Sequence, residues 1–445
     1  MARKTERTHR QGDESRKRIL EATLEIAAER GYDGTSVALV TERTGLPASS
    51  IYWHFGNKDG LIAAVLEHSY RAWREHAPDW DSAAAPERRG ETLQALLRQV
   101  DQAFIGKPEF WRLGLMLALG KFAKEPAARA RFLQVRGESL ERVAGWWARV
   151  LPAEVLDDAP AIPRILAQLN VATTDGFFLA ARAHGDWDFT RLLHMFAVGL
   201  DAAADLLVDR VRARAALPPG IAGDPGRSAA DSPAATASSG PEGDNSRLRI
   251  LSAAAEIAAE RGYEGTSIAR VCKRSGLPVS SLYWYFKDKD ELFASVLEHS
   301  FEQWSAGQAT WEPVVEPAGR AAGLRATLTR SLSSLAAAPD FMRIGHMLTL
   351  EQRETEPTAR VLFLDIRRRV LESMAEWFSA NLGEGPSARD PELPLTLAML
   401  LMAISDGLFI AEQVGDSWDL ETFVHVIVDM IEAIITDAAP ALAAG

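Results

Sequence analysis

The sequence is poor in the residues that build metal and catalytic centres. Its 445 residues include one cysteine, Cys272, and nine scattered histidines. A lone thiol cannot form an internal disulfide and falls short of a metal site. The spacing of zinc-binding histidines, a nucleophile elbow and a phosphate-binding glycine loop are also missing. We therefore expect neither enzyme activity, with no catalytic residues, nor a bound metal or cofactor.

Long hydrophobic runs are absent as well. The longest apolar stretches, such as residues 113–119 and 397–403, are much shorter than the roughly 20 residues that a membrane helix needs. The first ten residues are mainly charged and polar, unlike a secretory signal. With 47% hydrophobic and 25% charged residues, the composition is that of an ordinary globular protein. These features predict a cytoplasmic protein without a membrane partner.

The charge is unevenly placed along the chain. The net charge of −12 by itself argues against nucleic acid as a partner, but an average conceals local patches. Residues 1–18 hold seven Lys or Arg and only three acidic residues, and residues 247–289 also carry an excess of Lys and Arg. We expect residues 1–15 to form a basic arm. A solvated tail is the simpler interpretation of this arm, and an arm that enters a DNA minor groove is the alternative.

The most prominent pattern that is present is a repeat at a constant offset of 231 residues. Residues 31–36, Gly-Tyr-Asp-Gly-Thr-Ser, return as Gly-Tyr-Glu-Gly-Thr-Ser at 262–267. The same offset relates pairs far downstream, namely Pro108 and Pro339, Trp146 and Trp377, and the Asp-Gly pairs at 175–176 and 406–407. A period this long indicates two complete domains of one fold rather than a solenoid.

A stretch rich in Pro, Gly, Ser and Ala separates the two copies. Such a composition cannot bury a core, so residues 214–245 are predicted to be a flexible linker. About 30 flexible residues span roughly 30 Å, which is enough for the copies to pack side by side. The predicted domains are the arm 1–15, a small domain 16–76, a lobe 77–213, the linker, a second small domain 246–307 and a second lobe 308–440.

The fold class is predicted to be all-α. Apolar residues recur with helical period in both copies, and no strand pattern is found. Capping residues and glycines predict a helix that ends at Gly31, a short helix over 37–43, a third through residues 49–55 and a fourth from Lys58 to about His76. The lobe helices are expected near 91–105, 108–120, 125–150, 161–183 and 188–212, and again near 322–336, 339–351, 357–381, 391–413 and 418–437.

Two short helices joined by a glycine turn make a helix-turn-helix, whose second helix lies in the DNA major groove. Helix periodicity leaves Ala48, Ser49, Tyr52 and Trp53 on its outward face. Short hydroxyl groups can approach base edges closely, and longer side chains can reach phosphates. The pattern thus predicts a DNA-binding surface in each copy.

The sequence from Gly31 to Leu61 and its repeat from Gly262 to Leu292 resemble the DNA-binding segment of TetR-type (tetracycline-repressor family) transcriptional regulators. The block Tyr-Trp-His-Phe-Gly-Asn-Lys, or Tyr-Trp-Tyr-Phe-Lys-Asp-Lys in the repeat, is specific for that family. The resemblance implies a double-stranded DNA operator as partner, a dimer of two DNA-binding heads, and a lobe that binds a small apolar effector. The implied DNA-binding residues, together with their outward-facing neighbours, are Thr35, Ser36, Ala48, Ser49, Ser50, Tyr52, Trp53, His54 and Lys58, and Thr266, Ser267, Val279, Ser280, Ser281, Tyr283, Trp284, Tyr285 and Lys289.

The lobes are rich in aromatic residues, most of which should belong to the core. Some of them could instead line an effector pocket together with a few polar groups. The candidate pocket residues are Phe110, Trp111, Arg136, Trp147, Asn170, Phe177, Phe341, His346, Arg367, Phe378, Asp406 and Phe409. The matched pairs Asp175-Gly176 and Asp406-Gly407 suggest a packing or interface role at least as strongly as ligand contact.

These patterns favour a ligand-responsive repressor whose two copies form a pseudo-dimer within one chain and bind a near-palindromic operator. The last two helices of each lobe, within 161–212 and 391–437, would then form a four-helix interface. Two alternatives stay open. One is a homodimer of fused chains with four DNA-binding heads, and the other is a ligand-binding or partner-binding module in which one or both heads are vestigial.

Overall fold

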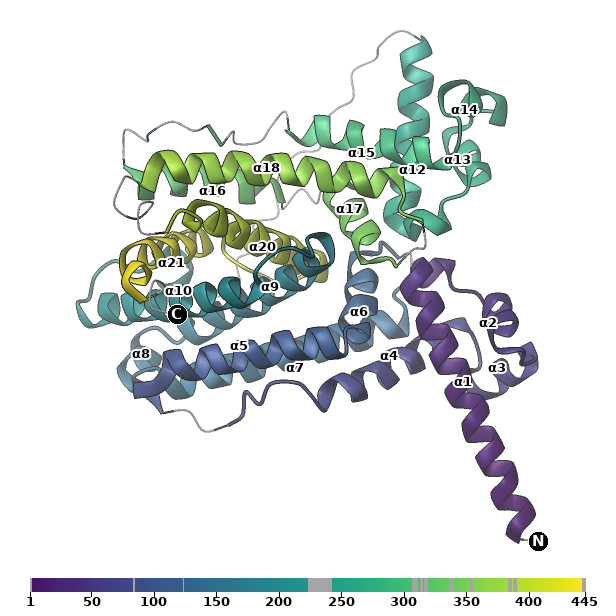
Figure 1. Cartoon of the computed structure of the whole chain (residues 1–445), viewed down its shortest axis with the longest axis horizontal. Coiled ribbons are helices and arrows are strands. Elements are labelled where there is room, and N and C mark those ends of the chain that lie inside the picture. The colour runs from purple at the N-terminus through teal and green to yellow at the C-terminus, as the bar shows by residue number, and fades with distance from the viewer. Residues whose placement is uncertain are drawn as a thin grey trace.

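The computed structural model describes residues 2–82, 85–122, 124–222, 242–305, 319–335, 340–352, 355–382 and 390–441, with a few isolated positions between them. Every regular element in these ranges is a helix, which confirms the predicted all-α class. Figure 1 shows two small helical domains at one end of the molecule and a stack of long helices at the other. We call the small domains the first head (α1–α4) and the second head (α12–α15), and the remaining helices of each half its lobe.

The first head contains α1 (Ala2–Gly34), α2 (Val37–Thr44), α3 (Ala48–Phe55) and α4 (Lys58–Arg74). Helix α1 is broken at Gly31, whose φ of 68° is open to glycine but strained for other residues. The Ser36 hydroxyl caps α2 by accepting from the Leu39 N–H, and Gly45 ends that helix in the left-handed region. The predicted basic arm is helical, since α1 already begins at Ala2.

The second head repeats this construction with α12 (Glu242–Gly265), α13 (Ile268–Ser275), α14 (Val279–Tyr285) and α15 (Lys289–Ser305). Even individual contacts recur at the offset of 231. Arg18 donates to the Thr44 carbonyl at 2.6 Å, and Arg249 donates to the Ser275 carbonyl at the same distance. The two heads are therefore copies of each other in three dimensions as well as in sequence.

The predicted lobe helices are all present in both halves, although the sequence did not predict the short segments η1, α8 and α11. The first lobe has η1 (Pro86–Arg88), α5 (Arg89–Gly106), α6 (Glu109–Leu119), α7 (Ala127–Val150), α8 (Ala153–Asp158), α9 (Ile162–Ala183), α10 (Phe189–Arg212) and α11 (Pro219–Ala222). The second has α16 (Arg320–Leu335), α17 (Asp340–Leu350), α18 (Thr358–Leu382), α20 (Leu393–Val414) and α21 (Leu420–Ala441). Most of the predicted linker, residues 223–241, lies outside the described residues.

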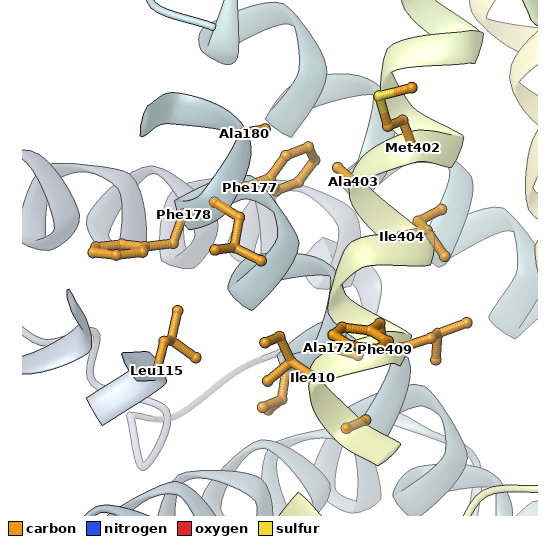
Figure 2. Close-up of a cluster of buried hydrophobic side chains, with 14 of the residues drawn as sticks. Leu115, Ala172, Phe177, Phe178, Ala180, Met402, Ala403, Ile404, Phe409 and Ile410 are labelled. Atoms are coloured by element: carbon orange, nitrogen blue, oxygen red, sulfur yellow. The ribbon is translucent and has the colours of Figure 1, made fainter. Parts of the chain in front are cut away.

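The two halves pack against each other through the last two helices of each lobe. Helix α9 lies against α20, and α10 lies against α21, as the four-helix prediction requires. Figure 2 shows the apolar cluster at this contact, where Phe177 and Ala172 of α9 meet Ala403 and Phe409 of α20. These side chains are almost completely buried. Burial of apolar surface is thus what holds the two lobes together.

Glycine allows α9 and α20 to cross at close range. A β-carbon on Gly176 would overlap the Ala403 carbonyl oxygen, and one on Gly407 would overlap the Ala172 carbonyl oxygen. The two contacts are related by the 231-residue offset, so the crossing lies on a pseudo-twofold axis. Helix α20 is apolar and long enough to cross a membrane, but 83% of its apolar window is buried in the protein. It is therefore accounted for as a core helix of this interface.

Candidate nucleic-acid interface

The third helix of each head exposes aromatic side chains to solvent. Tyr52 and Trp53 on α3 are 51% and 79% exposed, and Tyr283 and Trp284 on α14 are 53% and 83% exposed. Ile51 and Leu282, beside them in sequence, are buried and anchor the helices to the heads. Large exposed aromatics in such nearly equal pairs mark a binding surface rather than a packing defect.

The start of each of these helices carries small side chains on the same surface. Ser49, Ser280 and Val279 are exposed, whereas Ala48, Ser50 and Ser281 are half-buried. Pro47 and Pro278 precede the helices, and neither supplies a side-chain cap. The first backbone N–H groups of α3 and α14 therefore lack a side-chain cap and can meet a phosphate.

The Thr35 and Thr266 side chains point into the heads, so their hydroxyls are not placed for the predicted DNA contact. Both residues are 1% exposed. Their hydroxyls donate to the carbonyl oxygens of Gly31 and Gly262, at 2.7 and 2.8 Å. They satisfy carbonyls freed where the glycine breaks the first helix, which is a structural role.

Ser36 and Ser267 lie at the N-termini of α2 and α13, and their hydroxyls accept hydrogen bonds there. The Leu39 N–H donates to Ser36 Oγ at 3.2 Å, and the Arg270 N–H donates to Ser267 Oγ at 3.4 Å. Each serine thus caps its helix, and its hydroxyl hydrogen is left for another acceptor. A phosphate contact from these serines stays a prediction.

The predicted phosphate-binding lysines are held within their heads. The Lys58 ammonium lies 4.7 Å from the centre of the Tyr32 ring and donates to the Asp33 carbonyl at 3.3 Å. Burial lowers the pKa of Lys58, and the Asp33 carboxylate opposes that shift. Lys289 repeats the contact 4.1 Å from the centre of the Tyr263 ring.

His54 and Tyr285 occupy the same position in the two heads. Both side chains are half-buried near the end of the third helix. Burial lowers the pKa of His54, and the nearby Arg16 guanidinium lowers it further, so the imidazole is neutral at pH 7. A contact from His54 to DNA would therefore be a neutral hydrogen bond.

The second helix-turn-helix is more basic than the first. Arg270, Lys273 and Lys287 occupy the positions of Leu39, Glu42 and Gly56, and all three are exposed. Lys and Arg near a DNA-binding surface neutralise phosphates and release counterions. The sequence analysis did not single out these three residues, although a comparison of the repeats position by position contains the signal.

Each head is tied to the lobe of the other half. The Lys121 N–H, just after α6, donates to the Ala259 carbonyl in α12 at 3.1 Å. In the counterpart of this bond, the Gln352 N–H, just after α17, donates to the Ala28 carbonyl in α1 at 2.8 Å. The heads also touch where α1 and α12 end, with Arg261 3.9 Å from Asp33. The spacing between the heads is therefore set by contacts that cross the pseudo-twofold axis.

The candidate effector-pocket residues lie in the packed lobes. All twelve are buried, and their charged members are paired within the protein. Arg136 binds Asp175 at 2.9 Å and also binds Asp416 of the other half. Arg367 binds Asp406 at 2.9 Å, and His346 lies 3.3 Å from the same carboxylate. The Asp of each Asp-Gly pair thus neutralises a buried arginine.

A cavity of about 860 Å³ lies where the heads meet the lobes, and one of about 340 Å³ is lined by residues of the two lobes. None of the twelve candidates lines either of them. A pocket built from these twelve residues therefore stays a prediction. In the part of the chain that the structure describes, no group of three His, Cys, Asp or Glu side chains is placed to hold a metal ion.

Comparison with known proteins agrees with the geometry of the heads. The model of a family described as "Bacterial regulatory proteins, tetR family" matches residues 19–65 and again residues 250–296. The two matches are separated by 231 residues and span the helix-turn-helix of each head. The chain therefore contains two tandem copies of this DNA-binding segment.

Individual relatives are transcriptional regulators. The HTH-type transcriptional regulator BetI of Burkholderia thailandensis is 27% identical over 181 residues, which are 39% of this chain and 85% of BetI. The regulator TtgR of Pseudomonas putida is 38% identical over 61 residues, 14% of this chain and 29% of TtgR. Among solved structures, a transcriptional regulator from Rhodococcus aligns at 28% identity with a TM-score of 0.31, covering 42% of this chain and 94% of the other.

Proposed function

We propose that this chain, which belongs to the TetR family and carries two tandem units, is a ligand-responsive repressor that binds a near-palindromic operator as a single-chain pseudo-dimer. The observation that carries the proposal is the matched exposure of Tyr52 with Tyr283 and of Trp53 with Trp284. Two equivalent surfaces in one molecule suit an operator with two half-sites. In this interpretation, residues 16–76 and 246–307 are the DNA-binding domains, 77–213 and 308–440 are the regulatory lobes, and the protein acts in the cytoplasm.

Rigid spacing of the heads supports the same function. A dimeric helix-turn-helix protein must present its two recognition helices about one DNA turn, roughly 34 Å, apart. The crossed bonds of Lys121 with Ala259 and of Gln352 with Ala28 connect each head to the opposite lobe. A change in either lobe would therefore move the opposite head, which is what release of DNA by an effector requires.

Footprinting on the intergenic DNA beside the gene, followed by affinity measurements on the protected segment, tests the proposal. We expect Tyr52→Ala and Tyr283→Ala each to weaken binding about tenfold or more, because each removes a phosphate or base contact from one head. Ile105→Ala, which removes a 74% exposed side chain from α5, is the matched control and should bind normally.

Three outcomes distinguish the alternatives. Normal binding by both tyrosine variants would contradict the DNA-binding role. Loss of binding in one variant only would indicate that the other head is vestigial. A footprint of two separate operators, with two chains per DNA in sedimentation, would favour the four-headed assembly.

A further inference from the structure

The two cavities are counterparts of each other. The larger one is lined by Arg112, Arg182, Gln352 and Arg360, and the smaller one by Arg343, Gln413, Lys121 and Arg129. Each residue of the first set is related to one of the second by 231 positions. The volumes nevertheless differ, at about 860 and 340 Å³. The two halves thus carry a large and a small version of the same site, related by the pseudo-twofold axis.

Three arginines from different helices meet in the larger cavity. Arg112 comes from α6, Arg182 from α9 and Arg360 from α18 of the other half. Arg112 is 7% exposed, and its Nε has no hydrogen-bond partner. Within the described ranges, neither Arg112 nor Arg182 forms a salt bridge, although Glu109 lies near both. Arg360, in contrast, pairs with Glu356. Buried cations without counter-ions are costly, so Arg112 and Arg182 favour the binding of an anion.

The environment of Arg182 points the same way. Its guanidinium lies 3.5 Å from the centre of the Phe178 ring and donates to the carbonyls of Phe178 and Phe104. Burial lowers the pKa of Arg182 to about 9, and the positive charge of Arg112 contributes to that shift. The guanidinium is still charged at neutral pH, so a bound anion would relieve the repulsion between the two arginines.

In the smaller cavity, the counterpart of Arg112 finds hydrogen-bond acceptors within the protein. There Gln413 replaces Arg182, and its side-chain oxygen accepts from Arg343, the counterpart of Arg112. Arg343 also donates to the Leu119 carbonyl at 2.6 Å. With one arginine fewer and a neutral acceptor in its place, this site gives its main cation two hydrogen-bond acceptors from the protein, although Arg343 Nε, like Arg112 Nε, has no partner. The larger cavity lacks this internal arrangement.

We propose that the larger cavity binds a small anionic molecule that presents a phosphate or carboxylate group to Arg112, Arg182 and Arg360. A volume of about 860 Å³ is in the range of small-molecule sites. Of the carboxylates in the wall, Glu264 lies at the end of α12 and Glu351 is near Gly31 and Gly262, on the side of the heads, whereas Glu356 pairs with Arg360. The anionic group would therefore bind on the lobe side, where the arginines are.

The position of this cavity links its ligand to both heads. Its wall includes Glu29 and Arg43 of the first head and Glu264 of the second. It also includes Gln352, whose N–H bonds Ala28 across the axis. An occupant would thus bias the placement of the first head and change the affinity for DNA. The effect on DNA affinity rests on the proposed function, whereas anion binding itself does not.

Calorimetric titration of the full chain with pyrophosphate and with citrate, at ionic strength fixed with NaCl, tests the proposal. We expect about one equivalent of at least one probe to bind saturably, and the probe that binds identifies phosphate or carboxylate as the preferred group. Arg182→Gln installs the residue that the other half already has, and should weaken binding at least tenfold. Arg112→Gln should do the same. Arg368→Gln, which removes an exposed positive charge from α18, is the control and should bind as wild type does.

Absence of saturable binding for both probes would overturn the proposal, as would equal affinities of Arg182→Gln and Arg368→Gln. Circular dichroism and thermal melting identify any variant that fails to fold. Calorimetry needs no DNA, so it decides on the anion site even if operator binding fails. Probe binding without a change in operator affinity would remove only the coupling to DNA.

Discussion

Gly407 packs directly on the backbone of Ala172, so that α20 and α9 cross without a side chain between them. The counterpart contact, Gly176 on Ala403, completes a crossing that joins the two halves. The neighbouring Asp175 and Asp406 each neutralise a buried arginine of their own lobe. The repeated Asp-Gly pair is thus explained by two structural tasks, helix crossing and charge neutralisation, performed by adjacent residues.

We predict that Gly407→Ala destabilises the protein by about 1–3 kcal/mol or more, because the new methyl group meets a backbone carbonyl that cannot move aside. Gly137→Ala is the control, since Gly137 lies in α7 with open space around its α-carbon. There the substitution should stabilise the helix by up to about 1 kcal/mol. Urea denaturation of the two variants measures both effects, and equal changes in the two would argue against a tight crossing.

The excess basic charge of the second head should appear in the salt dependence of DNA binding. Replacing Lys273 by Glu and Lys287 by Gly gives that head the residues of the first. We expect weaker binding and a shallower plot of log affinity against log salt, by about 0.9 for each phosphate that the head no longer neutralises. The reciprocal change Glu42→Lys should steepen it. Unchanged slopes in both directions would show that these residues do not face the DNA.

The difference between Ala48 and Val279 should make the two heads prefer different base pairs. The Val279 methyl groups are exposed at the start of α14 and suit the methyl group of a thymine. Val279→Ala should reduce affinity for a half-site with thymine at the contacted position by roughly 1 kcal/mol. It should leave the other half-site unaffected. Competition between operators altered in one half-site measures this preference, which is absent if both halves respond alike.

His184 should make the protein less stable in mild acid. Its ring stacks on Trp187 with 4.4 Å between ring centres. Burial lowers its pKa from 6.5 to about 4, helped by the charge of Arg367 and opposed by Asp406 and Asp186. Between about pH 6.5 and pH 4, His184 is therefore protonated in the unfolded chain but not in the folded protein. The stability is fully present above pH 6.5 and is lost as the pH falls from 6.5 toward 4.

His184→Phe keeps a ring on Trp187 and removes the titrating group. Between pH 7 and pH 5 the variant should lose less stability than wild type, by at most about 1.4 kcal/mol per pH unit, because His184 is partly exposed. Urea denaturation at several pH values gives this slope. Parallel curves for the two proteins would show that His184 does not contribute to the acid response.

Local sequence signals were sufficient to predict the helices. The predicted helix 37–43 is observed as Val37–Thr44, because Ser36 and Gly45 are the residues that cap and end it. The lobe helices were also found within a few residues, since their apolar periodicity is strong. Helix α8 has only six residues, which is too short for periodicity to reveal.

The candidate site was harder to predict, because side-chain direction depends on tertiary packing. Thr35 carries a hydroxyl group that could bind a phosphate. The break in the helix before it turns that hydroxyl inward, where it donates to the Gly31 carbonyl. The arginine cluster joins positions 112, 182 and 360, which are far apart in the sequence and belong to both halves. No local pattern connects them. The sequence alone shows only that Gln413 occupies the position of Arg182 in the repeat.

The packing of α9 and α10 on α20 and α21 also has a consequence for biosynthesis. Once α10 has been made, the ribosome must still add residues 213–441, which at about 5–20 residues per second takes roughly ten to fifty seconds. During that time the apolar faces of α9 and α10 have no partner, because α20 and α21 have not yet been translated. When the partner emerges, it is already tethered to the chain that needs it. Each molecule is therefore paired by its own translation, without a search among free subunits.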